Sequence, residues 1–525
     1  MSSHNAPDGA PDGATPQNIP GISRPWFVLA VTLVVGFLVE ALLHGQRLGL
    51  GFALAALIAA VGWLVLGRGL AARPSGSAIA VLAILVIAGA LVALRASPAL
   101  QVLDLLTGIG AVLLLAALFT TGGLTRFSLT DYAAALFISG LATMLQPFAL
   151  LFGDLPKARL AANRGRGLAP VLWGVLLALP LLIVFAALFA SADAVFAAYL
   201  RRLFDWDLAE LLTRAFLSLA LSWAAAGLAR HAFAPRIRLD HPPSLDFLRV
   251  GAQTAITLLT LVNALFLAFV AVQAVYLFGG ADTLGRSGLT HSEYARRGFF
   301  ELVTVAALAL SLILLLDWLQ RDTAGQSRRW VNLLHGVLVL LTLAILVSAL
   351  QRMRLYVQDY GLTELRFYTT AFMGWLAVVL IWLAATVLWG RRTDGIERRR
   401  FAFGSLIAGV LLIIGLNLVN PDATIARVNL DRAIAGIGQP LDARYLTRNL
   451  SADAAAALVE GLVRLPDREA QARLACELQA SATRLNQHSG QANWRGLNWG
   501  RVSGRRTLNQ ADSLVASFAV GCPSR

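Results

Sequence analysis

The sequence predicts an all-α protein of the membrane: a polytopic bundle of about twelve transmembrane helices, followed by a small α-helical extramembrane domain. Of its 525 residues, 57% are hydrophobic and 14% are charged, whereas soluble proteins are roughly 45–50% apolar. The chain also contains many apolar runs of about 18 residues or more, which is the length that a helix needs to cross a bilayer. Residues 420–525 are the one long stretch without such a run, and they predict the extramembrane domain.

The charge of the chain excludes several classes of protein. The formal net charge is +14, but most arginines lie in short loops between apolar runs. This distribution indicates membrane topology, so we expect no nucleic-acid partner. Lys157 is the only lysine, and neither a Walker A loop nor the strand of a protein kinase surrounds it, so we expect no nucleotide partner.

Residues 1–24 are rich in Pro, Gly, Ala and Asp and contain no apolar run. Because they have no apolar run to bury, we interpret them as a disordered tail. We do not expect a signal peptide, because no basic region opens them. Residues 25–419 then form the predicted bundle. Its spans are expected at 26–43, 48–66, 78–94, 99–121, 133–152, 168–190, 208–229, 253–278, 298–319, 330–351, 367–389 and 401–419.

The loops divide into two classes by their positive charge. Sixteen arginines and lysines lie in the loops 153–167, 230–250, 320–329 and 390–400, whereas the three loops between these carry eight. Positively charged loops stay in the cytoplasm, so we expect the sixteen to be cytoplasmic. Twelve spans then place both termini outside. We therefore predict a multi-pass protein of the cell inner membrane with a periplasmic C-terminal domain.

The C-terminal domain, 420–525, contains both cysteines, Cys476 and Cys522. Two cysteines confined to one domain fit a disulfide in an oxidising compartment, and the alternative is two unpaired core residues. Helices are expected at about 452–465, where Ser451 provides a cap, at 467–487 and at 509–520, with a loop rich in Gly, Asn, Trp and Arg before the last.

A first polar island is THSEYARRGFFEL, residues 290–302. Its threonine and Glu293 match a capping box, which predicts the start of a helix. Arg297 lies four residues from both Glu293 and Glu301, the spacing of ion pairs on one helix face. These residues form either a salt-bridged helix start or a site in which Arg296 or Arg297 receives an anionic headgroup or substrate group.

A second island, residues 351–368, joins the tenth and eleventh predicted spans. Tyrosines alternate in it with Arg354, Asp359, Glu364 and Arg366. Such a mixture is typical of the membrane interface, and Gly361 is expected to make the turn. Two further islands, 191–207 and 420–432, fall on the same outer side. The four islands together form either a docking surface for the C-terminal domain, which we favour, or the mouth of a binding cavity.

Seven polar residues fall inside the predicted spans, where a charge usually faces a partner or a cavity. They are Glu40, Asp104, Asn263, Gln273, Asp317, His335 and Asn417. Only Asp104 and His335 lie away from the span ends, and Asp104 is just one turn into its span. A proton-coupled transporter would carry a longer line of buried carboxylates. No catalytic triad and no zinc-protease motif is present. His291 and Glu293 lack further metal ligands, so no metal and no cofactor is expected.

Four stretches resemble one bacterial family. SADAVF, YARRGFFEL, LYVQDYGLTELRFY and NPDATIARVNLDR occur in this order, and the chain is similar over about 168–465 to a polytopic membrane family of unknown function, numbered four-one-seven-three, with its close relative four-one-five-three. The resemblance implies a many-helix inner-membrane protein with a short helical extracytoplasmic tail. It implies no activity.

Three functional hypotheses follow. The first is a non-catalytic membrane protein with a structural or sensory role, whose outer islands bind its own C-terminal domain and an envelope protein. The second is a transporter or channel for a small anionic or lipid-like substrate, with outer arginines at its entrance. The third is a membrane-embedded transferase for a lipid-linked substrate, with Glu293, Asp359 or Glu364 as its base.

Overall fold

The computed structural model describes residues 22–155, 188–203, 208–234, 250–278, 299–319, 326–388, 396–487 and 493–519, four single residues in 178–186, and Cys522. Every secondary-structure element in these ranges is a helix, and eleven helices among them are long and apolar enough to span a membrane. The all-α, polytopic fold is therefore confirmed. Most of the predicted span at 168–190 lies outside the described residues.

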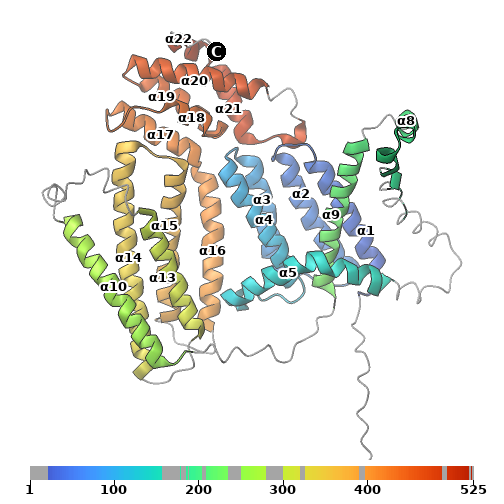
Figure 1. Ribbon diagram of the computed structural model, residues 1–525, viewed down its shortest axis with the longest axis horizontal. Helices are drawn as coiled ribbons and strands as arrows, with labels where there is room; N and C mark the ends of the chain where they lie inside the picture. The colour runs from blue at the N-terminus through green and yellow to red at the C-terminus, as the bar shows by residue number, and fades with distance from the viewer. Residues whose placement is uncertain are drawn as a thin grey trace, which may run out of the picture.

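The first half of the bundle contains α1 to α5 and α9, with a short helix, α8 (Ala194–Leu203), beside it (Figure 1). The upright helices are α1 (Pro25–Leu43), α2 (Leu50–Gly69), α3 (Gly76–Leu94), α4 (Pro98–Leu118) and α9 (Leu208–Phe233). Local sequence sets their starts. Pro25 and Pro98 occupy first-turn positions, where the missing N–H costs nothing, and the Ser75 side chain caps α3 by accepting from the amide of Ala78.

Helix α5 (Leu129–Ala149), which continues as a π-helix over Leu150–Asp154, differs from the prediction. It lies crosswise beneath the upright helices in Figure 1. A buried ion pair joins its end to α9, because Asp154 Oδ2 accepts from Arg230 Nε, 2.8 Å away near the end of α9. Both ends of α5 thus lie at the same face of the bundle, and the expected span at 133–152 does not cross it.

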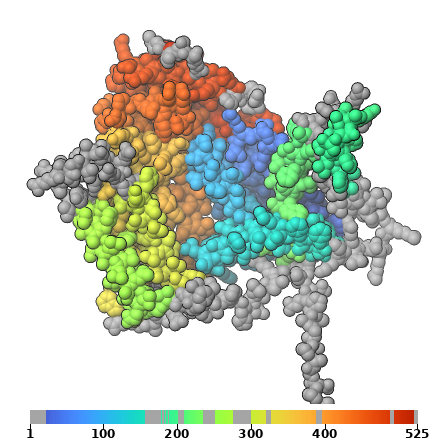
Figure 2. Space-filling model, in the orientation of Figure 1, coloured from blue at the N-terminus to red at the C-terminus, as the bar shows by residue number. Residues whose placement is uncertain are grey.

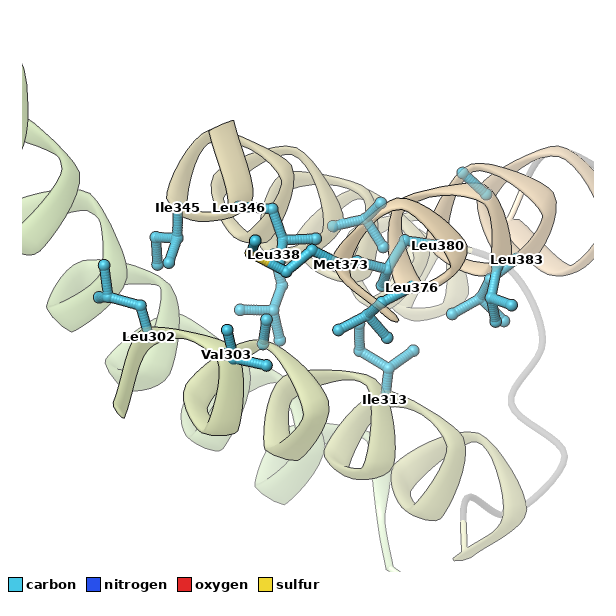
Figure 3. Packing of buried hydrophobic residues seen from close by; sticks show 14 of the residues in the cluster. Leu302, Val303, Ile313, Leu338, Ile345, Leu346, Met373, Leu376, Leu380 and Leu383 are labelled. Atoms are coloured by element: carbon cyan, nitrogen blue, oxygen red, sulfur yellow. The ribbon is translucent and has the colours of Figure 1, made fainter. Parts of the chain in front are cut away.

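The second half contains α10 (Ala252–Phe278), α13 (Phe299–Leu319), α14 (Gln326–Tyr360), α15 (Glu364–Leu383) with the π-helix η4 (Ala384–Leu388), and α16 (Ile396–Val419). Leucine, isoleucine and methionine side chains from facing helices fill its core (Figure 3). Helix α16 joins the halves, because Phe401 belongs to the core of the second half and Ala402 to that of the first.

The outer domain, residues 420–519 and Cys522 of the described chain, covers the ends of both halves on one side (Figures 1 and 2). Its elements are α17 (Pro421–Ile434), α18 (Ala443–Arg448), η5 (Ala452–Ala454), α19 (Ala455–Arg464), α20 (Arg468–Gln487), η6 (Trp494–Gly496), α21 (Trp499–Gln510) and α22 (Asp512–Phe518). A leucine-rich core holds them together, and a disulfide joins Cys476 to Cys522.

Part of the predicted loop before the last helix is helical, because α21 begins at Trp499. Its two glycines allow a close approach to η5. A Cβ at Gly500 would lie 2.0 Å from the Asp453 carboxylate, and one at Gly504 would lie 2.3 Å from the Ala452 carbonyl oxygen. Glycine weakens a helix locally, but here it permits backbone packing that a larger residue would prevent.

The two ends of the described chain lie on opposite faces of the bundle. Arg24, before α1, donates to the Gly69 carbonyl at the end of α2, 3.3 Å away. Ala41, near the other end of α1, accepts from Arg495 of the outer domain. The described start of the chain and the outer domain therefore lie on opposite faces, whereas the expected twelve crossings would place them on the same face. Helix α5 accounts for this difference, because it does not cross.

Candidate functional site at the outer face

The first island is only partly described. Glu293, Arg296 and Arg297 lie outside the described residues, so their ladder of charges stays a prediction. Glu301 is exposed in the first turn of α13.

The second island forms the turn between α14 and α15. Gly361 has a φ of +80°, which confirms its predicted turn, since this conformation favours glycine. The Arg366 guanidinium lies 4.0 Å from the centre of the Tyr356 ring and donates to the carbonyl oxygens of Tyr360 and Gly361. Arg366 is thus held by its own turn, whereas Arg354 is exposed.

This turn is bound by α17 and α18 of the outer domain. The Asn429 side chain accepts from the Leu362 amide at 2.9 Å and donates to the Leu362 carbonyl oxygen at 2.7 Å. Arg432 donates to the Asp359 carbonyl oxygen at 3.1 Å, and the Tyr445 hydroxyl accepts from the Glu364 amide at 2.9 Å. The outer domain therefore contacts the backbone of Asp359 and Glu364.

A second contact caps the turn between α3 and α4. Asp453 Oδ2 accepts from the amides of Ala96 and Ser97, at 2.6 and 3.2 Å. Asn498 donates to the carbonyl oxygens of Val92 and Arg95, at 2.9 and 2.8 Å. Helix α4 has no side-chain cap of its own, and its unpaired amides and positive dipole end favour a carboxylate. Asp453 provides that carboxylate from a position distant in sequence.

A third contact binds the turn between α1 and α2. The Leu50 amide donates to the Leu497 carbonyl oxygen at 2.7 Å, and Arg501 donates to the Leu48 carbonyl oxygen at 2.5 Å. Arg495 donates to Ala41 in the same corner. We call the contacts at the α14–α15, α3–α4 and α1–α2 turns the three docking contacts. Through them the outer domain binds both halves of the bundle.

Sequence reasoning identified one of these three contacts in advance. It pointed to the island at 351–368 and favoured a docking surface there, but it missed Asp453, Asn498 and Arg501. Asp453 follows Ser451 in a recognisable helix start, which indicates a local cap. No local pattern shows that the same carboxylate reaches the amides of a turn more than 350 residues away.

Most of the polar residues predicted inside the spans tie helices together. Glu40 pairs with Arg214 of α9 at 3.0 Å, and Asp317 pairs with Arg398 of α16 at 2.6 Å. Asp104 accepts from Asn417 of α16 at 3.0 Å. Two further residues of α10 reach α14: Asn263 donates to the Leu334 carbonyl oxygen and Gln273 accepts from Ser348 and Arg352. His335 is buried on α14.

Arg352 differs from its expected place. The sequence assigns it to an outer loop, but α14 continues to Tyr360, and Arg352 is buried, with Nη2 2.6 Å from Gln273 Oε1. The loop is correspondingly shorter than expected.

Buried ionisable groups collect beneath the outer domain. Asp422 is fully buried and accepts from the Ser451 amide at 3.0 Å. Burial raises the pKa of Asp422, hydrogen bonds from Ser451 oppose this, and the charge of Asp453 adds to it. Burial also raises the pKa of Tyr445 and lowers the pKa of Arg432. Within the described ranges, no group of three His, Cys, Asp or Glu residues is arranged to hold a metal ion.

Comparison with known proteins gives a family and no further relative. A family model described as a domain of unknown function, DUF4153, matches residues 78–461. The match begins well before residue 168, where the resemblance in the sequence was expected to start. No curated protein and no solved structure matches the chain.

Proposed function

Because the chain belongs to the family described as DUF4153, a domain of unknown function, we propose a role for it from the structure alone: it is an inner-membrane protein, non-catalytic, with a structural or sensory role at the periplasmic face of the envelope. The bilayer surrounds its helices. The outer domain presents the surface that an envelope protein would contact.

The observation that carries this proposal is the docking of the outer domain on three turns of the bundle. Asp453 and Asn498 hold the α3–α4 turn, Asn429 holds the α14–α15 turn, and Arg501 holds the α1–α2 turn. A domain held at three separated points fixes the two halves relative to each other. It would also transmit a force or a binding event at its outer surface to both halves.

Charge and redox chemistry support the orientation. Arginines such as Arg230 and Arg398 lie at the face opposite the outer domain, as expected of a cytoplasmic face. The Cys476–Cys522 disulfide lies in the outer domain, as expected of a periplasmic compartment.

Complementation of a strain that lacks the protein tests the role. Asp453→Ala removes a docking contact, whereas Glu364→Gln and Asp359→Asn keep the backbone hydrogen bonds of these residues to the outer domain and remove only their charges. We expect the two amide variants to restore survival under detergent and osmotic stress, and Asp453→Ala to restore it poorly. Asp467→Ala, which changes only a local helix start, is the matched control.

The transferase hypothesis predicts the opposite result. Loss of complementation by Glu364→Gln or Asp359→Asn, in protein whose outer domain stays protected from protease, would assign a chemical role to that carboxylate. The same comparison with Glu293→Gln covers the remaining candidate base of the first island.

A second candidate function, transport of a small anion, is favoured by one observation. Two arginine-lined cavities lie at opposite faces of the first half: about 710 Å³ at the outer face with Arg47 and Arg501, and about 1050 Å³ at the inner face with Arg126 and Arg399. Closely packed side chains of α2 to α4 lie between these faces. Transport would require this packing to open, and anion flux into vesicles reconstituted with the protein measures it.

A further inference from the structure

The outer cavity lies between the outer domain and the ends of the first four helices. Its volume is about 710 Å³. The turns before α2 and α4 line one side, with Gln101 one turn into α4, and the helices α18 to α21 line the other. The docking contacts at the α1–α2 and α3–α4 turns join these two walls directly.

The lining of this cavity is positive without a compensating acid. Four arginines and no aspartate or glutamate belong to it: Arg47, Arg448, Arg484 and Arg501. Arg448 is neutralised from behind by Glu477, with both nitrogen–oxygen distances at 3.2 Å. Arg501 donates to the carbonyl oxygens of Leu48 and Gly496, which carry no net charge.

Arg47 increases the local positive charge. It makes no hydrogen bond and no ion pair with the residues that the structure describes, in contrast to Arg501 beside it. Burial lowers the pKa of Arg501, and the charge of Arg47 lowers it further. Asp453 is the carboxylate that opposes this, but its Oδ2 already serves the amides of Ala96 and Ser97. Two guanidinium groups near each other, with the nearest acid engaged, favour an anion.

Most of the remaining lining is apolar. Eleven of its seventeen residues are apolar, and seven of these are leucines of the α1–α2 turn and the outer domain: Leu48, Leu446, Leu450, Leu458, Leu478, Leu485 and Leu508. Six uncharged polar residues complete the lining: Gln46, Gln101, Thr447, Asn449, Ser451 and Ser481. A free inorganic anion would leave this surface unused. An amphiphile with an anionic head and an apolar chain would contact both parts, and the outer ends of α1 to α4 lie where lipid headgroups lie.

We propose that this outer cavity binds the phosphate headgroup of an anionic lipid, with Arg47 and Arg501 receiving the phosphate and the leucines receiving the upper part of an acyl chain. This goes beyond the structural or sensory role, because the docking contacts do not depend on an occupant. Arg47 makes no hydrogen bond or ion pair with the described residues. Substituting it therefore tests lipid binding without removing one of these contacts.

The test uses the full-length protein in nanodiscs of phosphatidylcholine with or without phosphatidylglycerol. After mild detergent extraction, native mass spectrometry counts the phosphatidylglycerol that stays bound. Arg47→Glu places a carboxylate beside Arg501. This carboxylate can pair with Arg501 in the folded protein, and it repels phosphate. Arg47→Gln removes the charge alone. Arg473→Glu is the matched control, since Arg473 pairs with Glu469 on an exposed face of α20 outside the cavity.

We expect phosphatidylglycerol to be retained over phosphatidylcholine, retention to fall at least tenfold in Arg47→Glu and severalfold in Arg47→Gln, and no change in Arg473→Glu. Equal retention of both lipids, or retention unaffected in both Arg47 variants, would overturn the proposal. A separate arm titrates inorganic phosphate and follows thermal unfolding. Protection by phosphate alone, without lipid retention, would overturn the lipid and leave a free anion in its place.

Discussion

At the scale of single residues, Asp453 does the most to join the outer domain to the bundle. Its carboxylate is nearly buried and satisfies two amides that α4 leaves without a cap of its own. Sequence alone gives this aspartate a local role, because helix-start patterns are local and the partner turn is not. Docking, like most tertiary contacts, has no short-range signature.

Asp453→Ala leaves the amides of Ala96 and Ser97 without their partner in a buried place. We expect it to cost about 3 kcal/mol of stability at this contact. Limited proteolysis of the outer domain measures it, and Asp453→Asn, whose carbonyl still accepts a hydrogen bond, should lose less. Equal protease resistance of wild type and Asp453→Ala would contradict the assigned contact.

Asp422 makes the stability of the outer domain depend on pH. Its folded-state pKa is raised above the ordinary value of 3.8, chiefly by burial, so the folded protein binds this proton more tightly than the unfolded protein does. Stability attributable to Asp422 is therefore greatest below the unfolded pKa and falls as pH rises through the folded pKa. Asp453 and Glu364 are charged neighbours that take part in the same network.

Asp422→Asn removes that proton linkage. We expect the variant to lose the decline in unfolding midpoint that wild type shows as pH rises from about 4 upward. Thermal unfolding across this range, followed by the fluorescence of the outer domain, measures the slope. A variant with the wild-type slope would assign the pH dependence to another group.

At the scale of elements, apolar run length predicts the spans well. Ten of the eleven described helices that are long and apolar enough to span a membrane begin and end within five residues of their predicted limits, and α14 continues to Tyr360. The agreement follows because the bilayer demands a fixed apolar length. Helix α5 satisfies the same demand and still lies crosswise, with its end joined to α9 by the Arg230–Asp154 pair. Exposed Phe137, Met144 and Phe152 on α5 suit a helix at the edge of the apolar layer.

The α14–α15 turn depends on Gly361. Its φ is +80°, and a Cβ there would lie 2.2 Å from Asn429 Oδ1. Gly361→Ala should therefore strain the turn and displace Asn429, at a cost of about 2 kcal/mol. Urea unfolding of the purified protein measures this, with Gly374→Ala as the control, since a Cβ at Gly374 meets no atom within 4 Å. Equal loss in both variants would remove the special role of the turn.

At the scale of the whole molecule, one outer domain spans two helical halves that meet mainly through α16. Composition predicts the bundle and the separate domain. The number of helices that cross the bundle decides on which face α1 begins. Because α5 lies crosswise, α1 begins on the face opposite to the one that twelve crossings predict. Counting apolar runs cannot detect such a helix.

Reporter fusions test the resulting topology. If the outer domain lies in the periplasm, as proposed, we expect a phosphatase fused after Arg525 to be active and a fluorescent protein fused there to be dark. A fluorescent protein fused before residue 1 should glow, since α1 begins at the opposite face. Activity of phosphatase fusions at both ends would restore the expectation of two outer termini.

Hydrogen exchange at the docked turns tests the central claim, that the outer domain is fixed on the bundle at three points, most directly. The amides of Ala96, Ser97, Leu362 and Glu364 each donate to a side chain of the outer domain. We predict that in wild type these four exchange as slowly as amides inside helices, and that Asp453→Ala speeds the first two. Exchange of all four at the rate of an open loop would contradict the docked arrangement.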